Sequence, residues 1–144
     1  MATTRTAKTH WEGPLLEGGS GQVTLESSGL GTYDVSWPAR TDEAANGRTS
    51  PEELIAAAHS SCFSMALSAG LAKAGTPPTA LETRADVELT PGTGITGIHL
   101  TVTGAVDGMS EDDFVAAAED AKANCPVSQA LAAVPSIKLD AALA

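Results

Sequence analysis

The sequence predicts an α+β fold whose strands and helices follow the order βββαββαβ. Short alternating segments between glycine-rich breaks fill the first third of the chain, a strong helix start follows, and two further alternating runs surround a Pro-Gly turn. The chain has 144 residues and no internal repeat, which fits one domain over residues 1–144. Each element rests on its own local signal.

Three short strands open the chain, because β-favouring residues alternate there between breaks such as Gly18–Gly21 and Gly29–Gly31. We expect these strands at Lys8–Glu12, Gly21–Ser27 and Thr32–Trp37. Turns this short predict an antiparallel meander. The polar, charged segment from Pro38 to Thr49 is interpreted as a loop within the domain.

A long helix begins at Ser50-Pro51-Glu52-Glu53, where a Ser cap precedes Pro in the first turn and Glu53 stands at capping-box spacing. We expect it to run to about Gly75. No side chain from Leu54 to Ala72 is formally charged, a stretch long enough to raise the question of a membrane span. His59 and the many serines and alanines favour instead a central helix buried on nearly all sides, within the fold or within a dimer.

The second half of the chain adds a hairpin, two helices and a last strand. Thr83–Thr90 and Ile95–Val106 alternate across the turn Pro91–Gly94, and Ser110-Glu111-Asp112-Asp113 caps a helix to about Ala123. Asn124-Cys125-Pro126 restarts the chain into a short helix to about Ala133, and Pro135–Asp140 is the last expected strand.

Composition excludes several partners. The formal net charge is −10, which repels nucleic-acid phosphates and anionic lipid headgroups, so we expect neither nucleic acid nor a membrane surface as partner. Only 3% of the residues are aromatic, so the core is built from small aliphatic side chains, and self-association would add burial. The polar start, Met1 to Lys8, carries no signal-peptide pattern and predicts a cytoplasmic protein.

Two cysteines, Cys62 and Cys125, are the candidate reactive groups. In a reducing compartment a permanent disulfide is not expected, which leaves a redox role, a metal role or simple burial for each. Cys62 stands far from the helix start, and a free thiol is only about 3% ionised at pH 7, so a reactive Cys62 needs a cation or strong donors nearby. Cys125 precedes a helix that starts at Pro126, where free N–H groups stabilise negative sulfur.

A metal site is the first alternative to redox chemistry. The histidines His10, His59 and His99 have no partner at CxxC or HxxxH spacing, so we expect no metal and no organic cofactor. The second alternative is a binding module without enzymatic activity, in which Cys62 is a small buried hydrophobe.

Two segments around the cysteines resemble the osmotically inducible protein C (OsmC) family, which is related to the organic hydroperoxide resistance (Ohr) proteins. The segments are Pro51–Leu67, with Ala57-Ala58-His59-Ser60-Ser61-Cys62, and Asn124–Leu131, with Cys125-Pro126-Val127-Ser128; His10-Trp11-Glu12-Gly13 also fits. The resemblance covers essentially the whole chain. It implies a thiol-dependent peroxidase for organic hydroperoxides and hydrogen peroxide, active in oxidative and osmotic stress, folded as an intertwined homodimer with active sites at the subunit interface.

The resemblance also implies roles for individual residues. Cys62 corresponds to the peroxidatic cysteine, Cys125 to the resolving cysteine, and Glu52 to a glutamate that holds an activating arginine; without the family, Glu52 would be a first-turn acid that complements the helix dipole. The arginine of the Ohr branch is missing from Gly18–Gly21, which favours the OsmC branch and Arg40 in Trp37-Pro38-Ala39-Arg40. Arg48, close to the helix start, is the competing candidate.

The implied reaction uses the Cys62 thiolate to attack a peroxide oxygen, which expels an alcohol or water and leaves a sulfenic acid. Cys125 then condenses with the sulfenic acid to form a Cys62–Cys125 disulfide. An external dithiol, for example one on a lipoyl-bearing protein, would reduce this disulfide. The preferred peroxide depends on loops that the sequence does not place.

Overall fold

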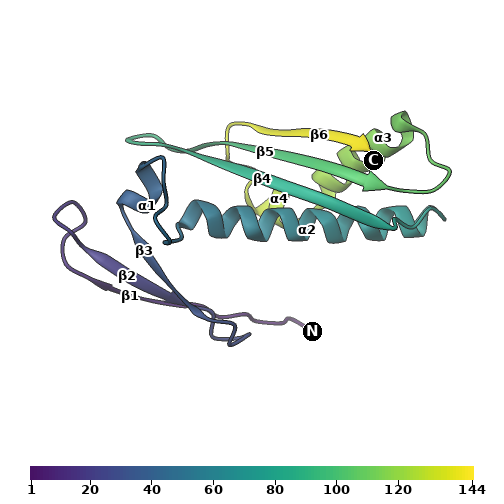
Figure 1. The fold of residues 1–144 in the computed structure, drawn as a ribbon. Coiled ribbons are helices and arrows are strands. Elements are labelled where there is room, and N and C mark those ends of the chain that lie inside the picture. The colour runs from purple at the N-terminus through teal and green to yellow at the C-terminus, as the bar shows by residue number, and fades with distance from the viewer. The chain divides into compact units, whose positions relative to one another are not determined.

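The computed structural model describes residues 1–144 as two compact units, Met1–Pro51 and Glu52–Ala144. The first unit is a three-stranded antiparallel sheet in the order β1-β2-β3, with β1 at Lys8–Glu12, β2 at Ser20–Thr24 and β3 at Thr32–Ser36 (Figure 1). The expected meander is confirmed, and β2 ends three residues earlier than its sequence pattern indicated.

A short helix, α1 at Pro38–Thr41, corrects the expectation that the segment after β3 is loop throughout. Pro38 supplies the φ angle of a first helical residue, and Asp42 N–H donates to the Pro38 carbonyl oxygen at 2.9 Å, which closes the single turn. The turn brings the Arg40 guanidinium over the Trp37 ring, 5.5 Å from its centroid.

The second unit contains a long helix and a mixed sheet. Helix α2 is Pro51–Lys73, and it is followed by β4 (Ala80–Thr90), β5 (Gly94–Ala105), α3 (Glu111–Asn124), α4 (Pro126–Ala130) and β6 (Ile137–Leu143). The sheet order is β4-β5-β6; β4 and β5 form the expected antiparallel hairpin, whereas β6 runs parallel to β5. Because parallel neighbours need a crossover, α3 and α4 form the connection between them (Figure 1). The predicted α+β class is confirmed.

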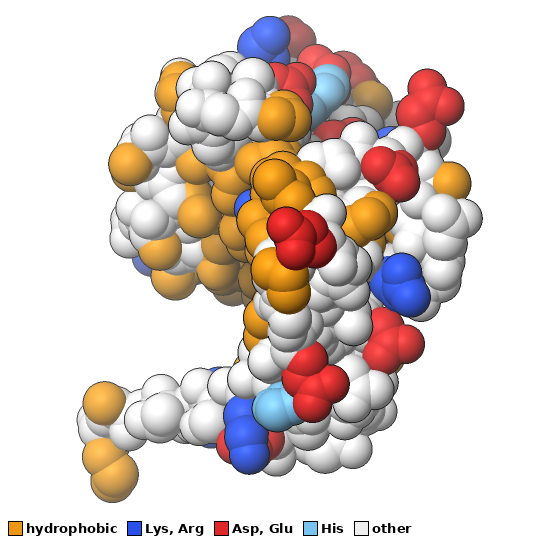
Figure 2. Space-filling view, turned by 90° about the vertical axis from the view of Figure 1, so that its left-hand side faces the viewer, with side chains coloured by type: hydrophobic (Ala, Val, Ile, Leu, Met, Phe, Trp, Pro, Cys, Tyr) orange, Lys and Arg blue, Asp and Glu red, His pale blue; other side chains and the backbone are white.

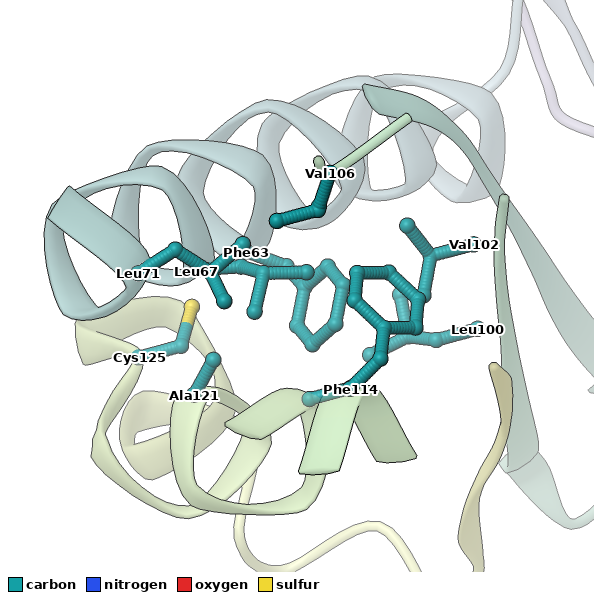
Figure 3. Close-up of a cluster of buried hydrophobic side chains, with 10 residues drawn as sticks. Phe63, Leu67, Leu71, Leu100, Val102, Val106, Phe114, Ala121 and Cys125 are labelled. Carbon is teal, nitrogen blue, oxygen red and sulfur yellow. The ribbon is translucent and has the colours of Figure 1, made fainter. Parts of the chain in front are cut away.

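The core of the second unit lies on the face of the sheet that both α2 and α3 cover. Helix α2 contributes Phe63, Leu67 and Leu71, whose four-residue spacing forms one stripe, and the inward positions of β5 contribute Leu100 and Val102. Figure 3 shows these side chains meeting the Phe114 ring of α3. The core therefore fixes α3, and the cysteine at its end, against α2.

Only one stripe of α2 is buried within a single chain, and Met65 is 71% exposed. The expectation of burial on nearly all sides thus depends on a second copy and stays a prediction. By length and composition alone α2 could cross a membrane, a test that core helices of soluble proteins also pass. The buried stripe of α2 packs into the hydrophobic core of the second unit, as a core helix does.

Figure 2 shows charged side chains scattered over the visible face, with hydrophobic side chains in a contiguous band.

Candidate functional site

The structure brings the two predicted cysteines together. Cys62 projects from the middle of α2 and Cys125 joins α3 to α4; both are free thiols, and each lies close enough to shift the pKa of the other. Cys125 is completely buried, and Figure 3 shows its sulfur pointing toward α2. Cys62 is partly exposed. Cys62 is therefore the sulfur that solvent reaches, and Cys125 lies directly behind it.

The position of Cys125 follows from its neighbours in the sequence. A residue before proline disfavours the helical conformation, and Cys125 is extended, with φ −61° and ψ 123°. It ends α3, where its N–H donates to the Ala121 carbonyl oxygen at 2.8 Å, and it also precedes the first residue of α4, Pro126. One residue thus serves as the cap of two helices, which holds the sulfur beside the free N–H groups of α4.

Burial and several nearby donors act in opposite directions on the pKa of Cys125. Burial opposes its ionisation, but the nearby Ser128 N–H, Cys62 thiol, Ser128 hydroxyl and Val127 N–H together outweigh burial, so the pKa of Cys125 is lowered. This direction agrees with the stabilisation of negative sulfur expected at the start of α4.

Cys62 behaves in the opposite way. Burial raises the pKa of the Cys62 thiol, the Val127 N–H lowers it in part, and the Cys125 thiol raises it further. Within the second unit the surroundings therefore favour ionisation of Cys125 over ionisation of Cys62. A reactive Cys62 needs a further cation, as its place in the helix predicted.

A buried histidine and a serine complete the site. His59 stands three residues before Cys62, on the same side of α2, and is 0% exposed. Its Nε2 lies 2.7 Å from Ser128 Oγ, and its Nδ1 has no hydrogen-bond partner. Burial lowers the pKa of His59, so the imidazole is neutral at pH 7.

The remaining predicted site residues lie elsewhere in the chain. Arg40 lies in α1 of the first unit, beside Trp37. Arg48 is also in the first unit, where it lines a polar surface pocket with Asp34. Glu52 is buried in the first turn of α2. Helix α2 is continuous, so ten residues place the Glu52 and Cys62 backbones about 15 Å apart along its axis.

The other histidines have separate partners. His10 Nε2 lies 3.2 Å from Glu12 Oε1, and His99 Nε2 lies 2.7 Å from Asp140 Oδ2. The structure gathers no group of three or more His, Cys, Asp or Glu side chains that could hold a metal ion.

Sequence reasoning missed His59 and Ser128 as a pair. From the sequence, His59 is a polar residue of the central helix, part of a motif and a rejected metal ligand, and Ser128 is only part of a motif. Two spacings carry a signal, because His59 precedes Cys62 by three residues on a helix and Ser128 follows Cys125 by three. The contact between the pair joins residues far apart in the sequence, so it required the fold.

Comparisons with known proteins agree on one family. The family model described as OsmC-like protein matches residues 44–140. The chain is 43% identical to "Peroxiredoxin OsmC" of Escherichia coli strain K12 over 92% of this chain and 93% of that protein, and equally to "Peroxiredoxin OsmC" of Shigella flexneri. A solved structure from Legionella pneumophila, described as an organic hydroperoxide resistance protein OsmC, has a TM-score of 0.76 at 26% identity and covers 99% of this chain and 98% of its own. OhrB of Bacillus subtilis, at 22% identity, 96% and 98% coverage and a TM-score of 0.65, shares the fold.

Proposed function

The chain belongs to the OsmC-like protein family, and from that premise we propose that it is a thiol peroxidase that uses Cys62 and Cys125 to reduce organic hydroperoxides and hydrogen peroxide. One observation carries the proposal: a partly exposed Cys62 thiol lies beside a completely buried Cys125 thiol, close enough for each to shift the pKa of the other. A peroxide can reach the Cys62 sulfur, and Cys125 is placed to attack the oxidised Cys62 afterwards.

In the oxidation step the Cys62 thiolate attacks one peroxide oxygen. An S–O bond forms as the O–O bond breaks, the leaving alkoxide takes up a proton to become an alcohol, and Cys62 becomes a sulfenic acid. Cys125 then attacks the Cys62 sulfur; the S–S bond forms, hydroxide leaves and is protonated to water. The lowered pKa of Cys125 favours the thiolate that this second step needs.

Arginine supplies the missing stabilisation of the Cys62 thiolate in this proposal. We keep Arg40 as the candidate, because its neighbours Trp37-Pro38-Ala39 match the family pattern, with Arg48 as the competitor and Glu52 as the carboxylate that orients the guanidinium. A guanidinium also donates hydrogen bonds to the peroxide oxygens as charge moves onto the leaving group.

Further parts of the proposal concern assembly and partners. We propose a homodimer, a single functional domain over residues 1–144, a cytoplasmic location and a dithiol reductant, for example one that bears a lipoyl group. The Legionella structure supports the domain assignment, because it aligns with 99% of the chain. The disulfide requires a reductant, because two electrons must return to the sulfurs after each turnover.

Single-turnover kinetics test the assignment of the two cysteines. With cumene hydroperoxide and with hydrogen peroxide, Cys62→Ser should consume no peroxide, whereas Cys125→Ser should consume one equivalent and leave Cys62 prone to overoxidation. Equal single-turnover rates for Cys62→Ser and the wild type would exclude Cys62 as the peroxidatic residue. Failure of the wild type to lose any free thiol to either peroxide would favour a binding module instead.

A further inference from the structure

His59, Ser128 and Cys125 lie in one continuous chain of contacts behind the reactive pair. His59 Nε2 lies 2.7 Å from Ser128 Oγ, and Ser128, three residues after Cys125 at the start of α4, has a hydroxyl that helps to lower the pKa of Cys125. His59 and Cys125 are 0% exposed and Ser128 is 7% exposed. Polar groups buried this deeply have few alternative hydrogen-bond partners, so the position of each of the three side chains limits that of the next.

The hydrogen-bond count fixes the direction of this chain. If His59 carried its proton on Nδ1, the unpartnered Nδ1 would be a buried orphan donor, whereas a proton on Nε2 leaves Nδ1 only as an unused acceptor. Orphan buried N–H groups are the rarer defect, so the proton belongs on Nε2. His59 Nε2–H then donates to Ser128 Oγ, which frees the single Ser128 O–H to donate to Cys125.

We propose that His59 and Ser128 form a hydrogen-bond relay that stabilises the Cys125 thiolate during its attack on oxidised Cys62. His59 acts through Ser128 and is a positioning residue. The inference rests on the proposed function for its place in the reaction, and it assigns a role to two residues outside the predicted set.

The relay moves no net proton. Cys125 loses its proton to solvent and attacks the Cys62 sulfur, the S–O bond breaks as the S–S bond forms, and the departing hydroxide takes a proton from solvent to become water. Because burial keeps His59 neutral, its contribution is a donor held in place and not a stored proton. The same donors stabilise Cys125 as the leaving thiolate when a dithiol reduces the disulfide.

Few other groups compete for control of Cys125. The titratable group that faces it directly is the Cys62 thiol of α2, and its neighbours in the buried cluster are apolar, among them Leu67, Leu71 and Ala121. Lys122, the basic residue in the last turn of α3, is paired with Glu119 at 2.8 Å.

Titration of Cys125 alone tests the relay without any peroxide turnover. In a Cys62→Ser background, thiolate absorbance against pH reports Cys125, and a variant without either cysteine provides the baseline that includes Tyr33. Loss of one donor to a thiolate in Ser128→Ala should raise the Cys125 pKa by about one unit, a tenfold loss of thiolate at a fixed pH below it. Ser128→Thr, which keeps the hydroxyl, should stay near the parent.

The contribution of His59 is read from a double-mutant cycle. His59→Leu should also raise the Cys125 pKa. His59→Gln should raise this pKa less, because the amide keeps an N–H donor. In a Ser128→Ala background, His59→Leu should cause no further rise. Ser60→Ala, on the same helix, is the control and should leave the titration unchanged. An unchanged titration in Ser128→Ala, or a His59→Leu effect that persists without the Ser128 hydroxyl, overturns the relay and leaves the peroxidase proposal intact.

Discussion

Gly104 is a position where one methyl group should perturb both stability and the reaction. It lies on β5 directly under the buried Phe114 ring, and a Cβ added there would lie 2.5 Å from Phe114 Cε2, nearer still to Cζ, and 3.2 Å from Leu81 Cδ2. Carbon atoms pack best at about 3.5–4.0 Å, so the ring must move by roughly 1 Å in Gly104→Ala. The ring is 0% exposed and has no free space to enter.

Overpacking of this kind costs about 1–3 kcal/mol of unfolding free energy. For a chain of this size each kcal/mol lowers the melting temperature by about 3 °C, so we expect a fall of roughly 3–9 °C in thermal unfolding followed by circular dichroism. Phe114 lies on α3, which leads directly into Cys125. A displaced α3 moves Cys125 relative to Cys62, so disulfide formation after a peroxide pulse should slow as well.

Gly70→Ala is the matched control. Gly70 lies in α2, a Cβ there meets nothing within 4 Å, and alanine in a helix is favoured by roughly 0.5–1 kcal/mol, so the melting temperature should rise slightly. Phe114→Leu added to Gly104→Ala should recover part of the loss. A melting temperature for Gly104→Ala equal to that of the wild type would show that the ring shifts without cost, and the packing argument would fail.

Two further predictions concern a cap and the activating cation. Ser110→Ala removes the side-chain acceptor of the Asp113 N–H, 3.2 Å away at the start of α3, and should cost about 1 kcal/mol in urea unfolding, whereas Ser110→Asp should retain most of the stability. Arg40→Ala should raise the pKa of Cys62, measured as alkylation rate against pH, far more than Arg48→Ala does; a shift with Arg48→Ala alone would reassign the role.

Elements that depend on local signals were predictable from the sequence. Ser110 accepts from the Asp113 N–H as expected of a cap, and Pro91–Gly94 turns the chain between β4 and β5 as expected of a hairpin. The proline after Cys125 likewise indicated the restart that places this sulfur at α4. Such signals depend on interactions between residues a few positions apart, so they can be recognised from the sequence alone.

Features that depend on distant partners were not predictable. The parallel pairing of β6 with β5 requires α3 and α4 to cross one face of the sheet, and nothing in the residues from Ile137 to Leu143 specifies that neighbour. The four-residue helix α1 was missed for a different, local reason, because its only helix signal is Pro38. The contact of His59 with Ser128 spans 69 residues. Only the assembled core determines such pairs.

The assembly of the site can be argued from the geometry of α2. The helix is continuous, so Glu52 and Cys62 are about 15 Å apart along its axis and cannot meet at one peroxide from the same chain. If Glu52 orients the arginine beside Cys62, a second copy must supply it across a two-fold axis. The exposed side of α2 fits such a partner, because Ser64, Met65, Ser68, Ala69 and Ala72 line a groove with the start of β4 and carry no charge. We therefore expect an obligate homodimer with composite sites.

Subunit mixing tests this expectation, because Cys62→Ser and Glu52→Ala inactivate different halves of a composite site. Random exchange makes about half of the dimers mixed, each with one intact site, so about a quarter of the wild-type activity should return. If Glu52 acted within its own chain, no mixed dimer would hold a complete site and mixing would restore nothing. Glu53→Ala, a neighbouring first-turn acid, is the matched control and should be active before mixing. A stable and fully active monomer in sedimentation would refute the composite site, because one copy would then contain every group that the reaction requires.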